Sequence, residues 1–209
     1  LKKGARMLKI NKDAEPAFFA EFKEQHQPKS WDDLKPVTTT LRQHMMEQEQ
    51  TVSDKALCTY CEKTVTLESS HIDHIRPKDP SGRYAHLFAD YNNLTVSCCS
   101  KNSCGQKKDN EYHDDFINPV EENPSDYMTY EVTTGKVAPA NDSAQARVES
   151  TCKMLGLNSC YELLRARILV LLSLNAYREK GLLDYYIDTF EQFPTLIDFY
   201  RREYLQRGI

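Results

Sequence analysis

Glycine is scarce in this chain, with 7 among 209 residues, and the sequence shows no internal repeats. Hydrophobic residues make up 40% and charged residues 28%, which is typical of an ordered globular chain and not of a low-complexity segment. The longest apolar run covers residues 168–172, far short of the roughly 20 needed to cross a bilayer. At the start of the sequence, no charged segment leads into an apolar one, as it would in a secretory signal. We therefore expect a cytoplasmic protein with no membrane partner.

A strongly basic region is missing as well. The net charge is −4, and no segment of the chain is strongly basic. Proteins that bind nucleic acid through broad electrostatics carry an excess of positive charge. Any nucleic-acid contact of this chain is therefore expected to be local, or to be supplied by a partner.

Cysteine is plentiful and unevenly placed. Five of the seven cysteines lie between Cys58 and Cys104, whereas a disulfide-stapled secreted domain would spread them more evenly. A Cys-x-x-Cys turn at Cys58 and Cys61 presents two thiolates to one metal, and a second pair about forty residues later completes a tetrahedral site. Cys104 is one member of that pair, and Cys98 or Cys99 is the other. The pattern predicts a structural zinc ion, with a redox cysteine pair as the alternative.

The adjacent residues Asp73 and His74 lie between the two cysteine pairs, within the phrase Ile-Asp-His-Ile-Arg-Pro. Hydrolysis of a phosphodiester requires a base that activates water and a hard cation that neutralises the leaving oxygen. Histidine titrates near neutral pH and suits the first task, and an aspartate oxygen suits Mg²⁺ and the second. The pair indicates phosphodiester chemistry, and the alternative is an ordinary polar pair on the surface.

Hydrophobic periodicity divides the chain into four regions: a helical lead-in (1–52), a central core (53–116), a β-hairpin (117–140) and a helical C-terminal region (141–209). The expected helices cover residues 14–25, 38–46, 105–116, 159–178, 182–192 and 194–206. The expected strands cover residues 57–66, 70–75, 94–98, 127–132 and 136–138. The prediction is an α+β fold.

Taken in order, the motifs Cys-x-x-Cys, Asp-His-Ile-x-Pro, Asn-Leu and a late cysteine pair resemble an HNH endonuclease with the ββα-metal fold, over about residues 55–115. The resemblance implies that His74 is the general base, that Asp73 is a metal ligand and that Asn93 braces the loop between two strands. Cys98 is the favoured third zinc ligand, because neighbouring strand residues point to opposite faces and its distance from Asn93 suits the motif.

One position departs from the family pattern. The family's last motif residue is a His or Asn on the helix, commonly just after the final cysteine, and Gly105 occupies that place here. Asn102 and Asn110 are the favoured substitutes as the second Mg²⁺ ligand, ahead of His113, with a solvated polar loop as the alternative for all three. Mn²⁺ is the alternative cation.

Basic residues near the motif are candidates for phosphate contacts, and we favour Arg76 and Lys108. His71 lies two residues before Asp73 on the same expected strand. His71 either contacts and orients a metal ligand without binding the ion itself, or it is a polar surface residue.

The wider layout resembles one HNH group, the nuclease subunit (PtuB) of Septu antiphage systems, including those attached to retrons. That resemblance implies an ABC/SMC-like ATPase partner (PtuA-like) and, in the retron version, a reverse transcriptase and its multicopy single-stranded DNA. The expected function is endonuclease cleavage of nucleic acid, with DNA favoured and RNA such as tRNA as the other substrate class. The competing hypothesis is a non-catalytic zinc-knuckle adaptor that docks the ATPase.

Overall fold

The computed structural model describes residues 7–205 and confirms a mixed α+β fold. The chain begins with two helices, α1 (Ala17–His26) and α2 (Lys35–Glu49), joined by a short 3₁₀ turn at Trp31–Leu34. Helix α2 begins at Lys35 and not near residue 38, because Pro36 in its first turn has the backbone angle that helix starts favour.

The central region contains the strand pair and helix of the predicted ββα unit. Strands β3 (Ser70–His74) and β4 (Leu94–Cys98) are antiparallel, with Ser70 opposite Cys98 and His74 opposite Leu94. Helix α3 (Cys104–Lys108) follows β4. The prediction of two strands at these positions is confirmed.

Two predictions in the central region are wrong. Residues 57–66 are not a strand: after the short β1 (Thr51–Val52) and β2 (Lys55–Ala56), a tight turn carries Cys58 and Cys61. Glu62 donates its N–H to the Cys58 carbonyl in that turn, with a left-handed φ of 61°. The helix expected over 105–116 ends at Lys108, because Asp109 leaves the helical region with φ 47°.

The C-terminal part holds the predicted hairpin, β5 (Met128–Tyr130) and β6 (Val137–Pro139), and a group of helices. These are α4 (Gln145–Leu155), α5 (Tyr161–Glu179), α6 (Leu183–Tyr186) and α7 (Pro194–Leu205). The helix expected over 182–192 is cut to α6 and a 3₁₀ turn, and the last residue of the helix expected over 194–206 lies outside the described residues. Across the described residues, every helix is too short or too polar to span a membrane.

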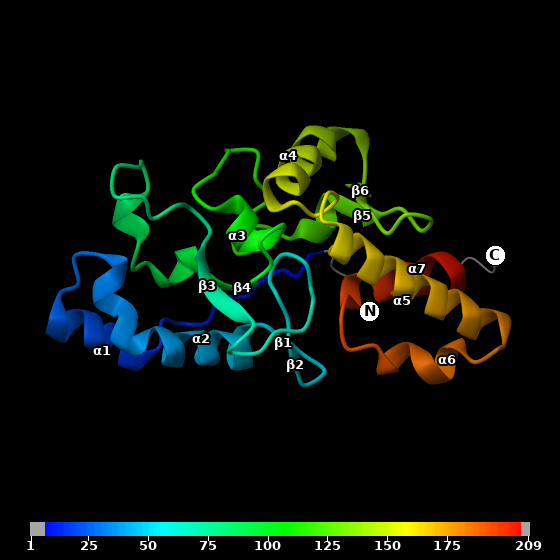
Figure 1. Ribbon diagram of the computed structural model, residues 1–209, viewed down its shortest axis with the longest axis horizontal. Coiled ribbons are helices and arrows are strands. Elements are labelled where there is room, and N and C mark those ends of the chain that lie inside the picture. Colours follow the sequence, from blue (N-terminus) through cyan, green and yellow to red (C-terminus); the bar gives the residue numbers. More distant parts are fainter. Residues whose placement is uncertain (1–6, 206–209) are drawn as a thin grey trace.

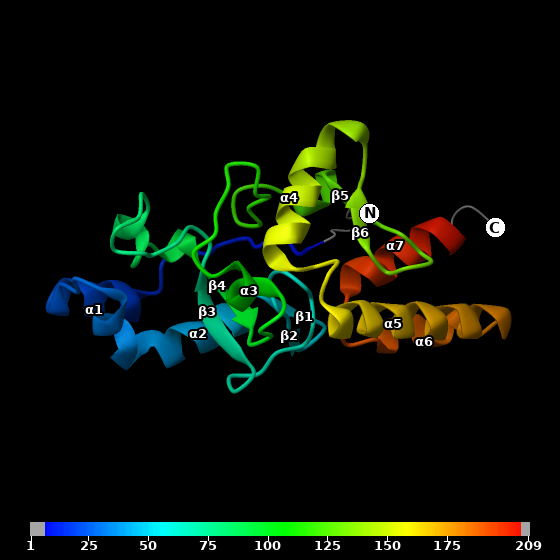
Figure 2. The same ribbon diagram turned by 45° about the horizontal axis from the view of Figure 1, so that its top comes forward.

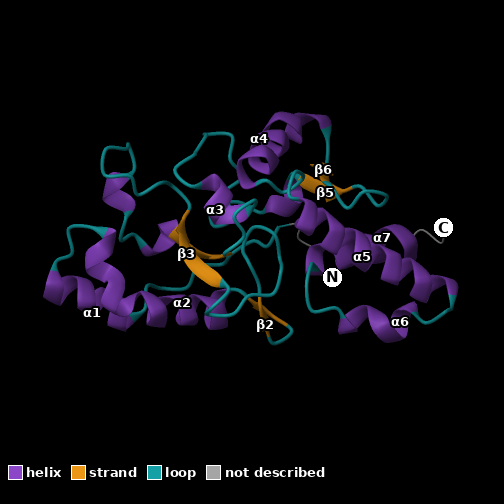
Figure 3. Ribbon diagram, viewed as in Figure 1, coloured by secondary structure: helices purple, strands orange, loops and turns teal. Residues whose placement is uncertain are grey.

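The elements are arranged along one long axis (Figures 1 and 3). Helices α1 and α2 lie at one end and α5–α7 at the other, with β3, β4 and α3 between them. Figure 2 shows α4 beside α3, with the β5–β6 hairpin next to α4 and α7. The ββα unit is therefore enclosed by helical segments from both ends of the chain.

Glu62 joins the cysteine turn to the C-terminal helices. Its carboxylate accepts hydrogen bonds from the backbone N–H of Met7 (2.8 Å) and from the N–H and hydroxyl of Thr195 (3.0 and 2.5 Å). Its carbonyl accepts from the N–H of Phe193 (3.0 Å). Burial raises the pKa of Glu62 to about 7. The hydrogen bonds from Phe193 and Thr195 to Glu62 fix the start of α7 against the turn that carries Cys58 and Cys61.

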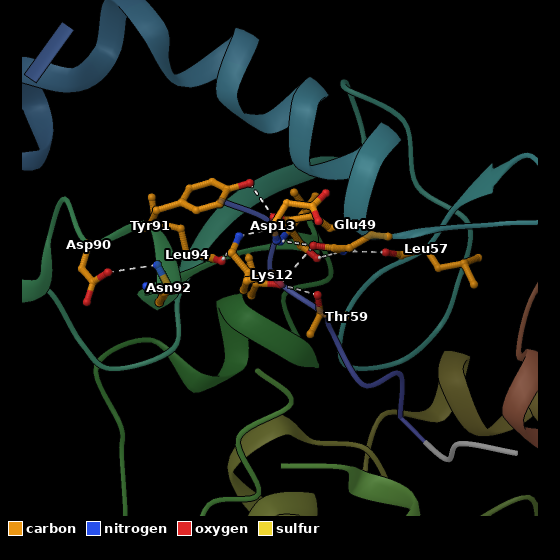
Figure 4. A network of polar contacts seen from close by, with 12 residues as sticks. Lys12, Asp13, Glu49, Leu57, Thr59, Asp90, Tyr91, Asn92 and Leu94 are labelled. Carbon is orange, nitrogen blue, oxygen red and sulfur yellow. Dashed lines mark hydrogen bonds and ion pairs between the residues drawn. The ribbon is translucent and has the colours of Figure 1, made fainter. Parts of the chain in front are cut away.

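A second buried polar network fastens the N-terminal segment to α2 and β4 (Figure 4). Lys12 Nζ lies 2.7 Å from Glu49 Oε2 and 3.6 Å from the centre of the Tyr91 ring, and the Tyr91 hydroxyl donates to Glu49 Oε1 (2.5 Å). Directly after α2, the Gln50 side chain donates to the Val96 carbonyl and accepts from the Val96 N–H. These contacts hold α2 along the back of the strand pair.

We predict that Lys12→Met lowers the free energy of unfolding by about 3 kcal/mol, because it leaves the Glu49 carboxylate buried without its partner. The two side chains are only 5% and 0% exposed. Urea denaturation measures the effect, and the double variant Lys12→Met/Glu49→Gln should recover part of the loss. The matched control is Lys35→Met, whose ion pair with Asp32 is exposed and should cost less than about 1 kcal/mol. Equal losses in the two single variants would contradict the prediction.

Candidate functional site

Asp73 is held in one orientation on β3. Its Oδ2 accepts a hydrogen bond from the Tyr60 hydroxyl (2.6 Å) and lies 3.4 Å from Lys108 Nζ. Its Oδ1 faces α3, where it lies 2.7 Å from the point that a Cβ on Gly105 would occupy. One carboxylate oxygen is therefore fixed by the protein, and the other is directed to the start of α3.

His74, the last residue of β3, is buried and oriented by two contacts. Its Nε2 lies 3.0 Å from the Phe88 carbonyl, and the Trp31 ring meets the imidazole edge to face at 4.4 Å between centroids. A carbonyl only accepts, so in the neutral ring Nε2 carries the hydrogen and Nδ1 is the acceptor. Burial lowers the pKa of His74 to about 4. At neutral pH the ring is therefore uncharged and able to take up a proton.

A pocket of about 240 Å³ opens in front of Asp73 and His74. It is lined by residues of the lead-in, β3, the following loop and α3: Trp31, His71, Ile72, Asp73, His74, Pro77, Lys78, Gly105, Gln106, Asp109 and Asn110. Of the two favoured asparagines, only Asn110 is in this lining. Asn102 lies elsewhere, with its carbonyl against Gly156 at the end of α4, and His113 is exposed and paired with Glu111.

Asn93 is buried where the loop between β3 and β4 closes. Its side-chain oxygen accepts from the Arg76 N–H (2.8 Å), and its amide donates to the carbonyls of Arg76 (2.9 Å) and Leu87 (3.2 Å). The contacts connect the two ends of the loop, which carries Phe88 and with it the hydrogen-bond partner of His74.

The two residues expected to contact nucleic acid are engaged within the protein. Lys108 is 1% exposed, and its Nζ donates to the carbonyls of His74 (2.8 Å) and Asp109 (3.2 Å). Its burial contradicts the expected phosphate contact and places the residue in the support of β3. Arg76 pairs with Glu121 (2.7 Å) and lies outside the pocket lining.

Four cysteines converge beside the strand pair. The Sγ atoms of Cys58, Cys61, Cys98 and Cys104 are buried and all lie within 4.8 Å of one another. They come from the tight turn, the end of β4 and the start of α3. Four clustered thiols without an open side fit a structural zinc ion. Cys99 is exposed and points away, with its Sγ 3.9 Å from His71 Nδ1.

Sequence reasoning missed the part that Trp31 plays in the pocket. It is the single tryptophan of the chain, placed in a polar loop between two helices. That placement is an available signal, because a large aromatic ring in such a loop needs a packing partner, but it does not say that the partner is His74.

Comparison with known proteins agrees with this geometry. Residues 58–111 match the family model for HNH endonuclease. A protein of Vibrio cholerae serotype O1 biovar El Tor, named as an HNH endonuclease of retron Vc95, is 32% identical over 109 residues, or 49% of this chain and 52% of that protein. A protein of Escherichia coli, named as an HNH endonuclease of retron Ec83, is 26% identical over 137 residues, or 63% of this chain and 49% of that protein.

The chain thus spans about half the length of the curated relatives that it matches. The family predicted from the motifs is confirmed: residues 58–111 of this chain form an HNH endonuclease domain.

We predict that Cys98→Ser removes most of the bound zinc and lowers the melting temperature, whereas Cys99→Ser changes neither. The physical reason is that only Cys98 directs its thiol into the buried cluster. Metal content by plasma mass spectrometry and thermal melting of the purified chains measure the two effects. Loss of zinc from Cys99→Ser, or full retention by Cys98→Ser, would refute the ligand set.

Proposed function

We propose that this chain is a metal-dependent endonuclease that hydrolyses phosphodiester bonds in nucleic acid, with His74 as the general base. The observation that carries the proposal is the state of His74. The ring is uncharged, its Nε2 is committed to the Phe88 carbonyl, and it lies beside Asp73 on the wall of a pocket. A general base must be unprotonated and lie where substrate water can reach it, and these two features of His74 support the proposal.

In the proposed reaction, His74 Nδ1 accepts a proton from water as the water oxygen attacks phosphorus. The bond between phosphorus and the 3′-oxygen breaks, and the leaving oxygen takes a proton from solvent water, which leaves a 5′-phosphate and a 3′-hydroxyl. His74 then releases its proton to solvent. Asp73 Oδ1 would bind a divalent cation, Mg²⁺ or Mn²⁺. The cation supplies stabilisation of the negative charge on the leaving oxygen. Tyr60 and Lys108 keep the Asp73 carboxylate in place through its other oxygen.

The wider setting is also a proposal. Both relatives carry names that refer to retrons, and the motifs resemble Septu nuclease subunits. We propose that the chain is the nuclease effector of such a cytoplasmic antiphage complex, with an ABC/SMC-like ATPase, a reverse transcriptase and multicopy single-stranded DNA as partners and DNA as the favoured substrate. The net charge of −4 supports a nuclease that relies on a partner to grip its substrate.

We predict that His74→Ala lowers the cleavage rate by about 10²–10⁴-fold, which is the usual contribution of a general base. Zinc content and the circular dichroism spectrum should stay unchanged, because the ring is not part of the cysteine cluster. The assay uses the chain together with the proposed ABC/SMC-like ATPase partner, a divalent cation and labelled DNA or RNA. His26→Ala is the matched control, since His26 lies exposed at the end of α1.

The same assay distinguishes the nuclease hypothesis from the hypothesis of a non-catalytic zinc-knuckle adaptor. Cleavage by the wild type that is lost in His74→Ala supports the nuclease. Absence of cleavage of any DNA or RNA by the wild-type complex under activating conditions would favour the adaptor.

The pH dependence of cleavage gives an independent prediction. Because a base works unprotonated and burial lowers the pKa of His74 to about 4, kcat/KM should stay nearly constant as pH falls from 7 to about 5 and decline only near pH 4. An ordinary histidine would lose its base form near pH 6.5. A pH–rate profile with a midpoint near 6.5 would contradict the buried, neutral state of the ring.

A further inference from the structure

Two side chains of β3 meet above the start of α3, at the one place where α3 has no side chain. A Cβ built on Gly105 would lie 2.7 Å from Asp73 Oδ1 and 2.9 Å from His71 Nε2. Real Cβ atoms do not approach other atoms so closely. The imidazole and the carboxylate therefore fill the space that a side chain at position 105 would take.

The backbone of β3 explains why these two residues meet. Side chains at positions i and i+2 of a strand point to the same face, so His71 and Asp73 share the face that looks onto α3. Gly105 is held close to the sheet because its N–H donates to the Ser97 hydroxyl on β4 (3.0 Å). Both side chains also line the 240 Å³ pocket that contains His74.

The atoms that point away from this meeting place are occupied. Asp73 Oδ2 accepts from the Tyr60 hydroxyl, and His71 Nδ1 lies 3.9 Å from the Cys99 thiol. In the tautomer with hydrogen on Nδ1, Nε2 carries a lone pair and, like Asp73 Oδ1, lies within 3 Å of the same point beside Gly105. An imidazole nitrogen and a carboxylate oxygen side by side on the wall of one pocket are a candidate pair of ligands for a cation.

We propose that His71 Nε2 and Asp73 Oδ1 together bind the catalytic divalent ion, and that His71 makes the site select a first-row transition ion such as Mn²⁺ over Mg²⁺. The proposal rests on the proposed nuclease function and names the ligand that Gly105 does not provide. Imidazole is a good ligand for transition ions, whereas Mg²⁺ is bound through oxygen atoms and retains much of its water. In this assignment, Asn110 in the same pocket lining is not required for binding.

Gly105 supplies a test that leaves both ligands in the chain. Gly105→Ala places a methyl group against the Asp73 carboxylate and the His71 ring, so the two side-chain tips must move apart while both ligands stay in the chain. His71→Ala removes the nitrogen ligand itself. The matched control is His26→Ala, at an exposed position far from β3 in the sequence.

The experiment measures Mn²⁺ binding to the full, zinc-loaded chain by electron paramagnetic resonance, with Mg²⁺ as competitor. The wild type should bind Mn²⁺ at least about tenfold more tightly than Mg²⁺. His71→Ala and Gly105→Ala should each weaken Mn²⁺ binding by about tenfold or more, and His71→Ala should leave Mg²⁺ binding within about threefold. Zinc content and circular dichroism check that each variant is folded.

Spin-echo spectroscopy of the bound Mn²⁺ gives the decisive signature. The wild type and His74→Ala should both show modulation from a directly bound imidazole nitrogen, and His71→Ala should lose it. Retention of the nitrogen signal and of Mn²⁺ affinity in His71→Ala would overturn the proposal while leaving the nuclease function untouched. If Mn²⁺ binds normally through His71 but the complete complex cleaves no nucleic acid under activating conditions, the nuclease function is refuted and the metal site stands.

Discussion

The pairing of β3 with β4 is the constraint on which the rest of the structure depends. Its register sets His74 opposite Leu94 and Ser70 opposite Cys98, so one strand pair fixes the positions of His74 and of the cysteine cluster together. If the register shifted by one residue, Asp73 and His74 would each point to the other face of the strand pair. Asn93 then closes the loop between the strands and holds it at both ends.

Burial gives this small domain its chemical character. Desolvation keeps the His74 ring uncharged, and the same burial requires that every charged neighbour be paired. Lys108 shows this most clearly: its ammonium is enclosed by two carbonyls and the Asp73 carboxylate. The sequence suggested that Lys108 contacts phosphate, but in the structure it helps to hold the Asp73 carboxylate in place. Positive charge for the substrate must then come from other residues or from a partner.

Motif spacing predicted the strand pair, the hairpin, the HNH family and the clustering of cysteines, because each of these depends on local order along the chain. The sequence did not predict the turn at Cys58, where left-handed backbone replaces an expected strand, or the early end of α3 at Asp109. It also left Trp31 unassigned and His71 open between two alternatives. Contacts made across a fold, such as an imidazole that fills the space above a glycine, cannot be read from spacing in one chain.

The role of His74 as the base is the central proposal for this chain, and chemical rescue tests it most directly. The measurement is cleavage by the His74→Gly variant, in the complete complex and with divalent cation, as the concentration of free imidazole rises. If His74 is the base, the variant should cleave little without imidazole, and its rate should rise with imidazole and give the same 5′-phosphate ends as the wild type. A His74→Gly variant that cleaves as fast as the wild type with no imidazole present would contradict it.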